Sequence, residues 1–64
     1  MTPSLVPGAV VRHPDRPEWG LGRVQSVSGE RATVDFDHRG KVTLDLRRVR
    51  LVLVEPPRPP HPLP

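Results

Sequence analysis

Hydrophobic and polar residues alternate most clearly in the middle of the chain. In segment 31–37, Ala32, Val34 and Phe36 fall on one side, and charged or hydroxyl side chains fall on the other. Segment 41–46 repeats the pattern, with apolar residues at three alternate positions. A period of two is typical of a half-buried β-strand. The sequence therefore predicts two strands, each with one face in a core.

These two strands are predicted to pair as a hairpin through a loop at residues 38–40. A three-residue loop that ends in glycine suits a type I turn followed by a left-handed residue. Matching the apolar faces of the two strands predicts these cross-strand pairs: Phe36 with Val42, Val34 with Leu44, and Asp37 with Lys41.

A further strand is predicted over residues 20–28, ahead of a tight turn at Gly29. Val24 and Val27 are three residues apart, so strict alternation would place them on opposite faces. A β-bulge near residues 25–26 would bring both inward and bend the strand. Gly29 would take the first central position of a type II′ turn that joins this strand to the strand over residues 31–37. With the bulge included, this hairpin pairs Arg23 with Asp35 and Gly22 with Phe36.

Two shorter apolar segments, 8–13 and 51–54, complete a set of five strands, and residues 45–49 have the length of one helical turn. We therefore predict an all-β fold, a five-stranded SH3-like or Tudor-like small barrel over residues 8–54, with one helical turn before the last strand. An OB-like barrel is the alternative, for which the chain looks too short.

Residues 1–7 are predicted to be a flexible N-terminus. Six of the nine residues from 56 to 64 are proline, so residues 55–64 are predicted to be a disordered tail.

The segment from His13 to Val27 connects the first predicted strand to the second and carries the most distinctive residues of the chain. Pro14 and Pro17 end the first strand and stiffen the loop that follows it. Trp19 is the only tryptophan, and two interpretations of it stay open. It either closes one end of the barrel beside Phe36, or it is an exposed aromatic anchor for a base or a peptide. His13 is expected to hydrogen-bond the proline-rich loop.

Composition narrows the function classes. The 64 residues carry a formal charge of +3 and contain no cysteine, so disulfides and thiolate ligands are excluded. No apolar segment approaches the ~20 residues of a membrane span, and we expect a cytoplasmic protein. The three histidines, His13, His38 and His61, lack metal-ligand spacing, and no serine lies in a nucleophile motif. We therefore expect no enzyme activity, no metal and no cofactor.

Basic residues are the strongest functional signal, because guanidinium groups bind phosphates and carboxylates alike. Three carboxylates, those of Asp35, Asp37 and Asp45, are interspersed on the same predicted face and would partly neutralise it. We expect protein docking slightly ahead of low-specificity nucleic-acid binding, and a weak homo-oligomer is a third hypothesis. The candidate partner-binding residues are Arg12, Arg23, Arg39, Lys41, Arg47, Arg48 and Arg50, with Trp19 as the aromatic anchor.

From Gly8 to Val54 the sequence resembles a family of short bacterial proteins with a domain of unknown function. The resemblance is carried by the run His13-Pro14, Pro17, Trp19-Gly20-Leu21-Gly22 and Val24-Gln25-Ser26-Val27. More distantly, Gly8, Val11, His13 and the Trp19-to-Val24 segment look like the Tudor-like C-terminal domain of UvrD/PcrA-type repair helicases. That second resemblance implies a partner in transcription or repair, such as RNA polymerase or a repair factor, and no helicase activity.

Overall fold

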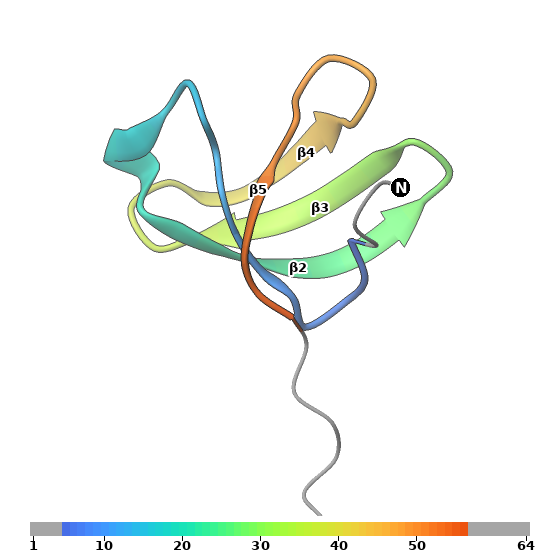
Figure 1. Ribbon diagram of the computed structural model, residues 1–64, viewed down its shortest axis with the longest axis horizontal. Coiled ribbons are helices and arrows are strands. Elements are labelled where there is room, and N and C mark those ends of the chain that lie inside the picture. The colour runs from blue at the N-terminus through green and yellow to red at the C-terminus, as the bar shows by residue number, and fades with distance from the viewer. Residues whose placement is uncertain (1–4, 57–64) are drawn as a thin grey trace, which may run out of the picture.

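The computed structural model describes residues 5–56 and shows one sheet of five antiparallel strands (Figure 1). The elements are β1 (Val10–Arg12), the 3₁₀ helix η1 (Pro17–Trp19), β2 (Leu21–Ser28), β3 (Arg31–Phe36), β4 (Gly40–Asp45) and β5 (Val52–Glu55). The strand order is β4-β3-β2-β1-β5, so the last strand returns to pair with the first. This confirms the predicted all-β class with five strands in one small domain.

A bulge bends β2 at the predicted place. Val24 pairs with Val34 and Ser26 pairs with Thr33, which leaves Gln25 as the extra residue. Val24 is buried and Val27 packs against the core, so the bulge brings both valines to the inner face. The predicted pairs of Arg23 with Asp35 and of Gly22 with Phe36 are confirmed. Gly29 has a φ of 59°, as a type II′ turn requires of its first central residue.

The predicted register of the β3–β4 hairpin is wrong by two residues. The structure pairs Val34 with Val42, Ala32 with Leu44, Asp35 with Lys41, and Phe36 with Gly40. The turn closes one residue earlier than expected, because the Arg39 N–H donates to the Phe36 carbonyl at 3.2 Å and Gly40 then takes a φ of 85°. A shift of two preserves the side-chain parity, so the same apolar residues still face the core.

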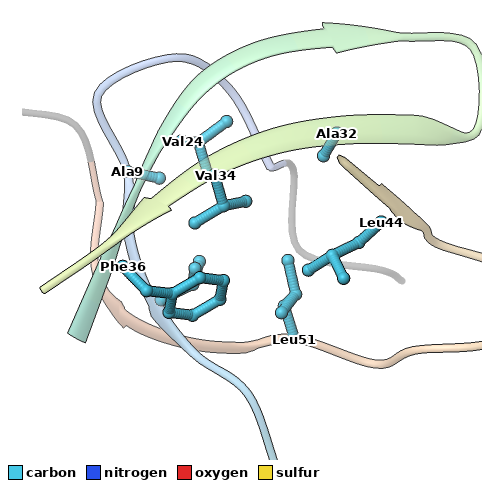
Figure 2. Packing of buried hydrophobic residues seen from close by; sticks show 8 residues of the cluster. Ala9, Val24, Ala32, Val34, Phe36, Leu44 and Leu51 are labelled. Carbon is cyan, nitrogen blue, oxygen red and sulfur yellow. The ribbon is translucent and has the colours of Figure 1, made fainter. Parts of the chain in front are cut away.

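Eight buried apolar side chains form the core inside the curve of the sheet (Figure 2). They are Ala9, Val11, Val24, Ala32, Val34, Phe36, Leu44 and Leu51. Leu5, within the segment predicted to be a flexible N-terminus, packs against them. The N-terminal segment is held there because the Gly8 N–H donates to the Val24 carbonyl at 2.9 Å.

The connection from β4 to β5 contains the predicted helical turn. The Val49 N–H donates to the Asp45 carbonyl at 3.0 Å, the spacing of one α-helical turn. β5 begins and ends one residue later than predicted. The predicted disordered tail spans residues 55–64, and from residue 57 onward it lies outside the described residues. Within residues 5–56, the structure has no helix with the length and apolar character needed to cross a membrane.

Deletion of Gln25 should destabilise the protein by about 1–3 kcal/mol. Without the extra residue, strict alternation turns Val24 or Val27 away from the core. The measurement is the free energy of unfolding from denaturant titration. Gln25→Ala, which keeps the chain length at an exposed position, is the control and should change stability by less than about 0.5 kcal/mol. A deletion variant as stable as the parent would contradict this account of the bulge.

Candidate docking surface

Three rings pack together at one end of the sheet. His13 follows β1, Trp19 ends η1 and Phe36 ends β3, so each comes from a different part of the chain. The Trp19 ring centroid lies 5.0 Å from that of His13 and 5.2 Å from that of Phe36, at interplanar angles of 68° and 61°. Edge-to-face pairs of this kind add about 0.5–1.5 kcal/mol each beyond their burial. The aromatic cluster of these three residues therefore ties the loop before β2 to the core.

Backbone contacts fix this loop against the β3–β4 turn. The His38 N–H donates to the Trp19 carbonyl at 3.0 Å, and the Asp37 N–H donates to the Leu21 carbonyl at 2.9 Å. Gly20 has a φ of 75°, and a Cβ there would lie 2.7 Å from Cδ2 of His38. The positive φ favours glycine here, and a larger residue would also displace the exposed His38 ring. The sequence analysis did not predict that His38 contacts the Trp19–Gly20 segment, and the glycine at position 20 was the only feature of the sequence that pointed to a close approach there.

His13 is a structural residue of the loop. Its side chain is buried, and its Nδ1 accepts a hydrogen bond from the Asp15 N–H at 3.0 Å. This confirms the predicted hydrogen bond to the proline-rich loop. An accepting Nδ1 places the proton of the neutral imidazole on Nε2.

Trp19 lies between the core and the surface. It is half-buried against the core, and the guanidinium carbon of Arg39 lies 5.6 Å from the ring centroid. At that distance the cation is attracted to the ring by about 0.5–1 kcal/mol in an exposed setting. Trp19 is therefore packed against the core on one side and accessible to solvent on the other, and its role as an anchor for a partner stays a prediction.

Trp19→Ala should cost about 3 kcal/mol of stability, the low end for removal of a large ring, because the side chain is only half-buried. Circular dichroism during thermal melting measures this loss. Trp19→Phe, which retains a ring against Phe36 and His13, should recover most of it. An alanine variant that melts with the parent would show that Trp19 does not support the fold.

The seven candidate basic residues do not gather into one stripe. Arg23 and Lys41 lie in a row on the outer face of the sheet, with Asp35 between them. Arg12 lies between Leu21 and Val52. Arg39 precedes β4, and Arg47, Arg48 and Arg50 follow it, so that the two sets are separated by a six-residue strand of about 20 Å.

Arg47 is engaged within the chain. Its Nε lies 2.9 Å from a carboxylate oxygen of Glu30 and 3.4 Å from one of Asp45. Asp45 in turn accepts a hydrogen bond from the Arg47 N–H at 2.9 Å, which caps the turn after β4. That backbone hydrogen bond, reinforced by the Arg47 side chain, lowers the pKa of Asp45 below its ordinary value of 3.8.

The ionised Asp45 should therefore stabilise the fold above pH 3.8, and this contribution should be lost as the pH falls through its lowered pKa. Asp45→Asn keeps a capping acceptor without the titratable charge. Melting temperatures at neutral pH and near pH 3 measure the effect. The parent should melt at a higher temperature than Asp45→Asn at neutral pH, and this difference in melting temperature should become smaller near pH 3. A difference in melting temperature that does not change with pH would contradict this role for the charge.

The outer face of the sheet is hollowed by a groove of about 430 Å³. Its lining residues are Val10, Leu21, Gly22, Arg23, Gln25, Asp35, Asp37 and Glu55. We call this surface the outer-face groove. An adjoining hollow of about 380 Å³ shares Val10, Arg23 and Glu55. Glu55, Val10, Arg23 and Asp35 are successive cross-strand neighbours, so the groove crosses β5, β1, β2 and β3.

The outer-face groove has apolar and acidic parts. Leu21 is 43% exposed. Val52, which does not line the groove, is 40% exposed and is separated from Leu21 by Arg12. Asp35, Asp37 and Glu55 contribute three carboxylates against the one guanidinium of Arg23. Sequence analysis placed Asp35 across from Arg23 but treated the acids as neutralising partners and did not foresee a groove.

The comparisons with known proteins give one match. No curated protein and no solved structure matches the chain. Residues 5–54, which include all three rings and nearly all of the five strands, match the family described as "Protein of unknown function (DUF3553)". Because the match covers most of its length, the chain belongs to this family of proteins of unknown function.

Proposed function

We propose that the chain is a non-catalytic β-barrel module that docks on a larger protein assembly through the outer-face groove. The observation that carries this proposal is the groove itself, in which the exposed Leu21 and the half-buried Val10 lie beside charged side chains on a preformed sheet. Mixed surfaces of this kind suit protein recognition, because apolar contacts supply affinity and charges supply specificity. The position of Leu21 in the groove is fixed by its backbone, because its carbonyl accepts a hydrogen bond from the Asp37 N–H at 2.9 Å.

A non-catalytic role is supported by how the polar groups are used. His13, the buried histidine, has its Nδ1 occupied by the Asp15 N–H and is therefore not free to act as a base at that atom. Asp45 caps a turn and pairs with Arg47. These groups stabilise the fold, and neither faces the outer-face groove.

The resemblance to the Tudor-like domain of repair helicases leads us to propose a transcription or DNA-repair assembly as the partner, with RNA polymerase or a repair factor as its docking subunit. Low-specificity nucleic-acid binding is the alternative outcome. It would use Arg48 and Arg50, which are both exposed. It is less favoured because Arg47 is paired and the groove carries three carboxylates, which repel phosphate.

Affinity capture with matched variants tests the proposal. The immobilised chain should retain a transcription or repair protein from an extract of its native cells, with little loss between about 50 and 200 mM salt. Leu21→Thr should abolish this capture, because it removes an exposed apolar contact of the groove while keeping a residue suited to a strand. Val6→Thr makes a comparable change at an exposed apolar site outside the groove and should leave capture intact.

Binding of a single-stranded DNA oligonucleotide is measured in parallel. Retention of DNA that falls steeply with salt, together with no captured protein, would overturn docking in favour of phosphate binding. Equilibrium sedimentation of the chain alone measures self-association. If Leu21→Thr disrupted only a homo-oligomer, the groove would be an interface between copies.

A further inference from the structure

We propose that the chain forms a weak homodimer in which β4 pairs antiparallel with β4 of a second copy, with Thr43 opposite Thr43 of that copy. This inference goes beyond the proposed docking function, because none of the residues that line the outer-face groove lies on β4. Three observations carry it: the open edge at β4, the direction of its backbone groups and the self-complementary order of its side chains.

The two edge strands of the sheet differ in how open they are to a further strand. β5 is four residues long, shifts register against β1 and ends at Glu55, directly before Pro56. Short length, bulges and proline keep an edge strand from pairing with other chains. β4 is six residues long and pairs with β3 in an unbroken register, and within residues 5–56 no strand lies on its other side. β4 is therefore the edge that can accept another strand.

The backbone of β4 determines which residues a further strand would bond. Each residue of an antiparallel strand directs its N–H and C=O groups to one side, and successive residues alternate between the two sides. The Leu46 N–H donates to the Glu30 carbonyl at 2.6 Å, toward the β3 side of β4. By alternation, the groups directed to the open edge are those of Lys41, Thr43 and Asp45.

The side chains of β4 are self-complementary in an antiparallel pair centred on Thr43. In that register Val42 lies opposite Leu44 of the second copy, and Lys41 lies opposite Asp45. Opposite charges then meet at both ends of the pair, which stabilises cross-strand pairing. Among the described residues, Lys41 takes part in none of the ion pairs, so its ammonium is available to this contact.

The same register continues the charge pattern of the outer face from one copy to the next. Within one chain Asp45 lies opposite Arg31, and Lys41 lies opposite Asp35. Across the dimer the row becomes Arg31, Asp45, Lys41 and Asp35, in which the charges alternate in sign. Registers centred on Lys41 or on Asp45 would instead set like charges opposite each other, which is destabilising. Charge complementarity therefore selects the register centred on Thr43.

The dimer should be closed and weak. Pairing around Thr43 is two-fold symmetric, so the contact is complete with two copies and does not extend into a filament. It uses one six-residue strand of each copy, and the Asp45 carbonyl already accepts from the Arg48 and Val49 N–H groups at 3.0 Å. A contact of this size is typical of transient association. Because β4 does not line the outer-face groove, both grooves stay open in the dimer.

Sedimentation equilibrium of the full chain tests the proposal. The parent should dimerise with a dissociation constant of about 10 μM to 1 mM. Lys41→Glu should weaken this at least tenfold, because it sets two carboxylates opposite each other at both ends of the pair. Arg12→Glu makes the same change of charge at an exposed residue of β1 and should dimerise as the parent does.

Thr43→Pro tests the backbone contact separately from the charges. It removes an N–H that faces the open edge, where proline is tolerated, and leaves the hydrogen bonds to β3 in place. It should weaken dimerisation at least tenfold, and a thermal melt shows that the variant is folded.

A cysteine at the centre of the pair tests the register, because the chain has no cysteine of its own. Opposed residues of a hydrogen-bonded antiparallel pair have Cα atoms about 5.5 Å apart, which is within the range of disulfides. On mild oxidation, Thr43→Cys should therefore form a covalent dimer at least tenfold faster than Ser26→Cys. Ser26 is the control because it is exposed on β2, an interior strand of the sheet.

The proposal is overturned if the parent stays monomeric up to about 1 mM, or if folded Thr43→Pro dimerises as the parent does. It is also overturned if Arg12→Glu weakens the dimer as much as Lys41→Glu, or if Ser26→Cys cross-links as fast as Thr43→Cys. Failure here is distinct from failure of the docking function. A chain that stays monomeric yet captures a protein through Leu21 would retain the docking function and lose only the dimer.

Discussion

The close approach of the Phe36 ring to Gly22 is the contact on which the rest of the structure depends. A Cβ at residue 22 would lie 2.6 Å from Cγ1 of Val34 and 2.7 Å from two ring carbons of Phe36. Only glycine at position 22 leaves room for the Phe36 ring to lie against β2 and stay fully buried. Because Phe36 is held there, Trp19 and His13 have a surface on which to pack, and the loop between β1 and β2 becomes part of the fold.

This arrangement links a small core to a hollowed outer face of the sheet. The inner face of β2 uses glycine and valine to admit large neighbours, and its outer face carries Leu21 and Arg23 into the groove. The Gln25 bulge brings Val24 and Val27 to the inner face, and Gln25 itself lines the groove on the outer face. A chain of 64 residues can thus present a shaped surface without a large interior.

The sequence predicted much of the fold because alternation and turn chemistry are local. The bulge, the pairing of Gly22 with Phe36 and the turn at Asp45 all follow from the spacing of a few residues. The β3–β4 register was mispredicted because both registers keep the same inward face, and only the turn geometry at Gly40 separates them. The outer-face groove could not be predicted, because its lining comes from four strands whose curvature depends on tertiary packing. The seven basic residues illustrate the same limit, since nearness in sequence did not bring them together in space.

The central claim is that Gly22 and Phe36 are coupled by direct contact, and a double-mutant cycle of Gly22→Ala and Phe36→Leu tests it most directly. The measured quantity is the free energy of unfolding of the parent, the two single variants and the double variant. Gly22→Ala should be strongly destabilising beside the phenylalanine ring and less so beside the narrower leucine, with a coupling energy of about 1 kcal/mol or more. Costs that add within about 0.5 kcal/mol would show that the ring is not what the glycine accommodates.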